Sequence, residues 1–197
     1  MSDVAENSRG VGDRLIVGLG NPGREYRDTR HNLGFRVVAR LAERWRVSLG
    51  HLECRALVGE STGIVLVAPQ TYMNRSGYSV RCLVEGHDVN STDILVVYDD
   101  VNLPLGRLRM RASGGPGGHR GMESIVQNLQ TEDIPRLRLG IALDESEMPD
   151  EDLVDFVLTT FAEDEEVTVR EMVDKAADAC ESWLREGCEA TMNRFNG

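Results

Sequence analysis

The hydrophobic positions of this chain fall into short apolar runs separated by amphipathic stretches. The runs at 14–19 and 93–98 are almost continuously apolar and end at glycine or aspartate, which is typical of strands buried on both faces. A Ser-Thr-Gly turn separates two further runs, at 55–59 and 64–69, and this predicts two neighbouring strands. Alternation of arginine and apolar residues predicts two more strands, at 107–111 and 136–141.

Between these strands, apolar residues recur at helical spacing. The pattern predicts helices at 31–47, 73–84, 122–129 and 163–185. Strands that alternate with helices along a chain of 197 residues predict one α/β domain of three layers. We expect a twisted, mixed and largely parallel sheet with helices on both faces. The domain should span 13–197, after a polar, disordered tail over 1–12.

A glycine-rich turn, Gly-Leu-Gly-Asn-Pro-Gly at 18–23, follows the first apolar run. It matches the dinucleotide-binding pattern, whose third glycine opens a helix and whose acidic residue lies about 20 positions later. Here Pro22 lies inside the turn, the helix is predicted to begin near His31, and the acidic position would fall inside that helix. We therefore reject a dinucleotide site. Two interpretations stay open: a tight turn without chemistry, or one that delivers polar side chains to the carboxyl end of a strand.

The charge of the chain is unevenly distributed. Residues 1–140 carry 18 Lys and Arg against 16 Asp and Glu, whereas residues 141–197 carry 4 against 17, so the net charge of −11 comes from the C-terminal third. Lys175 is the only lysine. Arginine suits phosphate binding, although a bias in genomic composition would give the same excess. We expect the acidic run 163–166 to be a solvated face at the N-terminus of a helix.

Cysteine usage and hydropathy predict a cytoplasmic protein. The four cysteines are scattered without a C-x-x-C pair, so we expect reduced, mostly buried thiols rather than a disulfide framework or a zinc site. The N-terminal stretch lacks the apolar segment of a signal peptide, and no run approaches the roughly 20 residues of a membrane span. His51 and His87 lie in polar loops and are interpreted as surface residues.

Polar side chains follow several of the predicted strands. Asn21 and His31 come after the first strand, Tyr72, Met73 and Asn74 after the strand at 64–69, Asp99 after the strand at 93–98, and His119 in the glycine-rich loop 113–121. In an open α/β sheet these positions can meet in one crevice. Histidine, aspartate and two asparagines suit hydrolysis by activated water, because histidine accepts the proton, aspartate orients it, and amides stabilise an oxyanion. No serine lies in a G-x-S-x-G motif and no cysteine adjoins a histidine, and the histidines lack metal-ligand spacing, so we expect attack by water without a metal.

Four ordered blocks carry a family resemblance: GLGNPG-x-x-Y-x-x-T-R-H-N, P-x-T-Y-M-N-x-S-G, D-D-V-N-L-P-x-G and G-G-H-x-G. Over roughly residues 13–195 the chain resembles the bacterial-type peptidyl-tRNA hydrolases. The resemblance implies cleavage, without metal or cofactor, of the ester between a peptide and the 3′ hydroxyl of tRNA. It implies that His31 is the base and Asp99 its partner, that Asn21 and Asn74 hold peptide and water, and that Tyr26, Met73 and His119 line the channel.

The last block departs from the family pattern. Arg120 stands where the family usually has asparagine, and it would either reach tRNA phosphates or intrude on the cleft. Arg109, Arg111 and Arg138 lie at alternate strand positions that fit phosphate contacts, with a solvated arginine face as the plainer alternative. We expect a monomer whose partner is peptidyl-tRNA, with no membrane and no obligate protein partner. A non-catalytic RNA-binding protein on the same fold is the second hypothesis.

Overall fold

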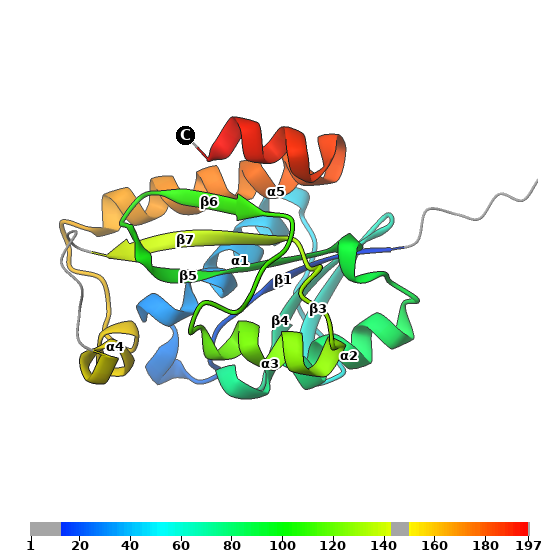
Figure 1. Cartoon of the computed structure of the whole chain (residues 1–197), viewed down its shortest axis with the longest axis horizontal. Coiled ribbons are helices and arrows are strands. Elements are labelled where there is room, and N and C mark those ends of the chain that lie inside the picture. Colours follow the sequence, from blue (N-terminus) through cyan, green and yellow to red (C-terminus); the bar gives the residue numbers. More distant parts are fainter. Residues whose placement is uncertain (1–12, 143–149, 197) are drawn as a thin grey trace, which may run out of the picture.

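In the computed structural model, which describes residues 13–142 and 150–196, a seven-stranded mixed sheet forms the central layer (Figure 1). The strand order is β2-β3-β4-β1-β5-β7-β6. The four central strands pair in parallel, and the strands at both edges pair antiparallel. The strands are β1 Arg14–Gly18, β2 His51–Glu53, β3 Ala56–Ser61, β4 Ile64–Pro69, β5 Ile94–Pro104, β6 Leu108–Arg111 and β7 Arg136–Ala142.

Helices cover both faces of the sheet, which confirms the predicted fold class (Figure 1). α1 (Leu33–Trp45) and α5 (Glu166–Phe195) pack on one face, and α2 (Ser76–Gly86) and α3 (Arg120–Leu129) pack on the other. α4 (Asp150–Val157) lies beside a 3₁₀ turn, η2, rather than on the sheet. The short 3₁₀ helices are η1 Arg24–Tyr26, η2 Arg30–Asn32, η3 Met73–Arg75 and η4 Ser91–Asp93.

Alternation along each strand builds the two hydrophobic clusters between these layers. In β1, Ile16 packs toward α1 and α5, whereas Leu15 and Val17 pack toward α2 and α3. All three side chains are fully buried, as expected for a strand whose successive side chains point to opposite faces of a covered sheet. β1 lies between β4 and β5 and is parallel to both. After β1 the chain first builds the strands on the β4 side and then crosses to β5 on the other side. Such a reversal of strand order opens a crevice at the carboxyl ends of the strands.

Gly34 lets the first helix approach the sheet closely. A Cβ atom at Gly34 would lie 2.2 Å from the backbone nitrogen of Leu19 and 2.4 Å from the carbonyl oxygen of Val97. Only glycine fits at such a backbone contact. The contact fixes the start of α1 against β1 and β5, and it therefore sets where the residues of η2, just before α1, meet the end of β5.

Several predicted elements differ from those observed. The helix predicted at 31–47 is a 3₁₀ turn followed by α1, and the prediction missed β2 and α4. α5 extends to Phe195, but Gly187 has a φ of 83° and interrupts the helical backbone close to the predicted end at 185. The predicted tail over 1–12 lies outside the described residues. Within the described part of the chain, no helix combines the length and the hydropathy of a membrane span.

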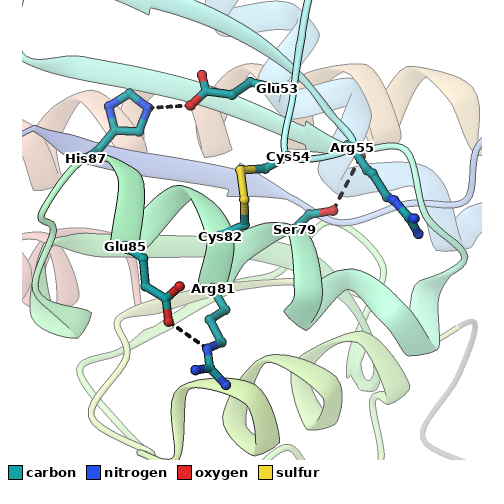
Figure 2. Close-up of a disulfide and its surroundings, with 8 residues drawn as sticks. All are labelled: Glu53, Cys54, Arg55, Ser79, Arg81, Cys82, Glu85 and His87. Atoms are coloured by element: carbon teal, nitrogen blue, oxygen red, sulfur yellow. Dashed lines mark hydrogen bonds and ion pairs between the residues drawn. A yellow bond between two sulfur atoms is a disulfide. The ribbon is translucent and has the colours of Figure 1, made fainter.

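A disulfide joins Cys54 to Cys82, so the prediction that all four thiols are reduced is wrong (Figure 2). Cys54 lies in the two-residue turn between β2 and β3, and Cys82 lies on α2. The cysteines are 28 residues apart, and packing of the turn against the helix brings them together. No motif spacing in the sequence could reveal the pair. Cys180 is free and buried, and Cys188 is free and half-buried.

Two other expectations about polar residues need correction. The acidic run 163–166 is not simply solvated, because Glu165 pairs with Arg30 and Glu166 pairs with Arg36. His87 is not a surface residue: Nδ1 lies 3.0 Å from Asp13, and Nε2 lies 3.3 Å from Glu53. Figure 2 shows the second of these pairs beside the disulfide. In both cases the partners lie far away in sequence, so composition alone suggested exposure.

Candidate active site

A cleft of about 1160 Å³ opens at the carboxyl ends of the parallel strands. Its lining comes from the turn after β1, from η2 and η3, from the end of β5, from the glycine-rich loop before α3, and from α4. With the exception of Tyr26 and Arg109, the residues selected from the sequence line this cleft. Tyr26 is half-buried in η1, where its carbonyl accepts hydrogen bonds from Thr29, and Arg109 is exposed on β6.

Two histidines share one buried carboxylate in the cleft. His31 Nδ1 lies 3.0 and 2.9 Å from the two carboxylate oxygens of Asp99. His119 Nε2 lies 3.3 Å from Asp99 Oδ1, and the centroids of the two imidazole rings are 4.9 Å apart. Asp99 is only 2% exposed, whereas His31 is partly exposed. Residues from η2, β5 and the loop before α3 therefore converge on one group.

The hydrogen bonds assign the proton positions on both rings. His119 Nδ1 accepts a hydrogen bond from the backbone N–H of Met122 at 3.2 Å, so the proton of the neutral ring is on Nε2 and is donated to Asp99. His31 donates its Nδ1 proton to Asp99 in the same way. Nε2 of His31 has no hydrogen-bond partner among the described residues. This nitrogen is therefore the available base of the site.

The surrounding charges separate the pKa values of these groups. Burial would raise the pKa of Asp99, but the charges and hydrogen bonds of His31 and His119 hold that pKa well below its usual range. Burial lowers the pKa of His31, but the Asp99 carboxylate outweighs burial and raises it above 6.5, against an opposing effect of Arg120. Asp99 is thus ionised at neutral pH. His31 loses its proton, and becomes a base, as the pH rises through its raised pKa.

The same three residues bring potential metal-ligand atoms within 4.8 Å of one another. Spacing along the chain had suggested that the histidines could not form such a group, and that part of the argument is wrong. In the structure, both ring nitrogens that face Asp99 are placed to donate hydrogen bonds to its oxygens. The geometry is that of a histidine oriented by a carboxylate.

Asn21 presents its amide group beside this pair. Its Oδ1 accepts a hydrogen bond of 2.8 Å from the backbone N–H of Met73, and Asn32 holds its backbone through bonds of 2.8 and 2.9 Å. The N–H groups of the Asn21 amide have no acceptor among the described residues. Asn74 is exposed in the cleft lining. Sequence analysis missed the role of Asn32, although its position directly after His31 offered a signal.

Arg30 holds η2, and with it His31, in position. The guanidinium donates to both carboxylate oxygens of Glu165, at 3.1 and 2.7 Å, and lies 4.6 Å from the ring centroids of Phe156 and Phe161. Arg30 is 5% exposed, so this pair is shielded from solvent. Sequence analysis did not single out Arg30, because its carboxylate partner is 135 residues away.

One wall of the cleft is rich in arginine. Arg111 is exposed on β6, and Arg138 of β7 pairs with Asp100. Arg136, two residues before Arg138 on β7, is only 2% exposed and donates to three backbone carbonyls, among them that of Gly115. Its guanidinium therefore supports the glycine-rich loop.

Another part of the lining is apolar and comes from α4. Leu153, Val154, Val157 and the adjacent Leu158 line the cleft, and Val154 and Leu158 are 43% and 37% exposed. Apolar side chains of this size that face a cleft indicate a surface for apolar groups of a ligand. Sequence analysis did not predict this helix. The cleft therefore combines a cationic wall, formed by the arginines, an apolar wall, formed by α4, and a histidine base.

Comparisons with known proteins show which family the chain matches. A family model described as peptidyl-tRNA hydrolase matches residues 15–197. A peptidyl-tRNA hydrolase of Bacillus cytotoxicus is 42% identical over 93% of this chain and 99% of its own length, and one of Synechococcus is 47% identical over 93% and 83%. The crystal structure of peptidyl-tRNA hydrolase from Acinetobacter baumannii superimposes with a TM-score of 0.86 and 32% identity, and covers 97% of this chain and 98% of that one.

Proposed function

The chain belongs to the peptidyl-tRNA hydrolase family and is a hydrolase that releases tRNA from peptidyl-tRNA, and we propose that it does so with water activated by His31. One observation carries this proposal: the Nδ1 atom of His31 is bonded to Asp99 at 2.9 Å, while Nε2 is left without a partner among the described residues. A neutral imidazole in this tautomer can accept a proton from water.

The proposed reaction breaks the ester bond between the peptide and the 3′ oxygen of tRNA. Nε2 of His31 takes a proton from water while the water oxygen bonds to the ester carbonyl carbon. The carbonyl oxygen becomes an oxyanion, toward which Asn21 and Asn74 donate N–H groups. When the carbonyl re-forms, the bond to the ribose oxygen breaks, and that oxygen receives the proton from Nε2. Asp99 stabilises the imidazolium between these two proton transfers.

The two walls of the cleft suggest how the substrate lies. We propose that the apolar side chains of α4 contact the peptide, whose side chains vary, and that Arg111 and Arg138 contact phosphates of the tRNA. Phosphate contacts give affinity without sequence readout, which suits an enzyme that accepts many tRNAs. Tyr72, Met73 and His119 would line the channel between the walls, and Arg109, outside the cleft, would add a peripheral phosphate contact.

We further propose that the enzyme needs no metal or other cofactor, that it acts as a monomer without an obligate protein partner, and that it works in the cytoplasm, where translation takes place. The protonated nitrogens facing Asp99 support the first point. Hydrolysis that is unchanged after dialysis against a chelator would support it further. Activity that disappears, and that returns only with an added divalent ion, would contradict it.

The decisive experiment measures release of peptide from a peptidyl-tRNA by wild type and by His31→Ala. A general base contributes roughly 10²–10⁴ in rate, so the variant should be nearly inactive while it still binds tRNA. A His31→Ala variant that hydrolyses as fast as wild type would refute the role of this residue. A wild-type protein that binds tRNA but releases no peptide would support the alternative, a non-catalytic RNA-binding protein on the same fold.

A further inference from the structure

We propose that Arg120 is an anion-binding residue of the cleft, whose guanidinium contacts a phosphodiester at the 3′ end of the substrate and thereby couples tRNA binding to proton abstraction by His31. This inference rests on the proposed function, because it takes His31 as the base. It assigns a role to the residue that follows the histidine of the G-G-H-x-G block, where the family usually has asparagine.

The first argument is the position of Arg120. It is the first residue of α3, directly after His119, and it lines the cleft together with His31 and Asp99. The N-cap interaction of His119 with the N–H of Met122, together with its bond to Asp99, ties this end of α3 to the catalytic pair. The backbone of Arg120 is therefore held in place next to His119, and its side chain starts from this position.

The second argument is that the Arg120 guanidinium has no protein partner among the described residues. Two other arginines of the lining already have protein acceptors: Arg138 pairs with Asp100, and Arg136 donates to three backbone carbonyls. Arg120 is exposed, and within residues 13–142 and 150–196 it has neither a hydrogen bond nor an ion pair. A guanidinium whose donors are all available in a cleft is suited to a planar anionic group such as a phosphate.

The third argument comes from the substrate. In a peptidyl-tRNA, the scissile ester is on the terminal ribose, and the phosphodiester on the 5′ side of that ribose is the nearest permanent anion. The Arg120 guanidinium can therefore reach this phosphodiester when the ester carbonyl lies over His31. Free inorganic phosphate is the other anion that a guanidinium would bind in the same way, and a competition experiment distinguishes the two.

Binding of that phosphate changes the electrostatics of His31. Among the residues that the structure describes, the charged or titratable groups that face His31 are Asp99 on β5, His119 in the loop before α3, and Arg120 on α3. Asp99 raises the pKa of His31 and Arg120 lowers it. A phosphate bound to Arg120 offsets its positive charge, so the pKa of His31 should be higher in the enzyme–substrate complex than in the free enzyme. The pH profile of kcat/KM reports the free enzyme and that of kcat reports the complex.

The binding test uses deacylated tRNA and the same tRNA lacking its three 3′-terminal nucleotides. For Arg120→Gln, we expect roughly tenfold weaker binding of intact tRNA. The slope of log K against log salt concentration should also decrease by about the amount that one phosphate contact contributes. The truncated tRNA should bind wild type and Arg120→Gln equally. The matched control is Arg81→Gln, which removes the same charge from an exposed position on α2, where Arg81 pairs with Glu85 (Figure 2).

The kinetic test compares pH profiles. In wild type, the apparent pKa should be lower for kcat/KM than for kcat. In Arg120→Gln both apparent pKa values should rise, because the cation that lowers the pKa of His31 is gone, whereas Arg120→Lys, which keeps the charge, should retain the wild-type values. Inorganic phosphate added to wild type should compete with intact tRNA but not with the truncated form. If phosphate competes equally with both, Arg120 binds free phosphate without reaching the 3′ end, and the proposal is overturned.

Three results distinguish a failure of this inference from a failure of the proposed function. If His31→Ala is inactive while Arg120→Gln leaves both apparent pKa values and the affinity for intact tRNA unchanged, only the role of Arg120 fails. If Arg120→Gln weakens both tRNAs equally, its contact is not at the 3′ end, and the inference also fails. If His31→Ala retains full activity, the proposed function fails first.

Discussion

Replacement of Asp99 by asparagine tests the catalytic pair most directly. Asparagine has nearly the same shape, but it offers one acceptor oxygen and one donor NH₂ group where Asp99 offers two acceptors. His31 Nδ1 lies within 3.0 Å of both oxygens of Asp99, so in Asp99→Asn it meets the amide NH₂ group as well as the remaining oxygen. If the NH₂ group donates to Nδ1, the ring proton of His31 moves to Nε2, and the base is lost. If the remaining oxygen keeps the Nδ1 proton, the tautomer of His31 survives, but the negative charge beside it does not.

The size of the effect follows from that charge. An imidazolium and a carboxylate whose charges are about 4 Å apart attract each other by about 4 kcal/mol at an effective dielectric constant near 20. Loss of this attraction in the transition state corresponds to a fall in rate of about 10³, and a wrong tautomer would add to it. We therefore expect kcat to fall by roughly 10²–10⁴ with little change in KM. Whatever activity is left should show a pKa for His31 below that of wild type, since Asp99 is the group that raises it.

The assay is single-turnover release of labelled peptide from peptidyl-tRNA at saturating enzyme, measured across pH. Asp100→Asn is the matched control, because it removes a neighbouring carboxylate that contacts Arg138 and the backbone of Asn102, with no bond to His31. Thermal melting of both variants checks that each is folded. A fall of less than tenfold in Asp99→Asn, or an equal fall in Asp100→Asn, would refute the assignment of Asp99 as the partner of His31.

Two further predictions concern the cationic wall and the disulfide. Arg111→Ala should weaken tRNA binding and reduce the slope of log K against log salt by about 0.7–0.9, as expected for one lost phosphate contact; an unchanged slope in a filter-binding titration would remove Arg111 from the tRNA contact surface. Reduction of the Cys54–Cys82 bond, which closes a loop of 28 residues, should lower the free energy of unfolding by about 3–4 kcal/mol and the melting temperature by roughly 5–15 °C. Calorimetry with and without reductant measures this, and Cys54→Ser should melt at the reduced temperature under both conditions; a wild-type protein insensitive to reductant would contradict the prediction.

The sequence determined much of the fold because the relevant signals are local. Continuous apolar runs indicated β1 and β5, and alternating arginines indicated β6. The grouping of polar residues after strand ends predicted that His31 and Asp99 would share a crevice, because parallel strands end at the same edge of a sheet. Each of these inferences needs only the period of the side chains and the order of the elements.

Only the tertiary structure decided which polar groups pair. The bonds of His119 to Asp99 and to the N–H of Met122 assign its tautomer, Arg136 is buried although its neighbour Arg138 lines the cleft, and Cys54 meets Cys82 only because a hairpin turn packs on α2. The apolar wall of α4 was also absent from the sequence-based prediction. The physical reason is common to all four: hydrogen bonds, burial and contacts between segments dozens of residues apart depend on distances in space. A pattern of residue types along the chain does not contain those distances.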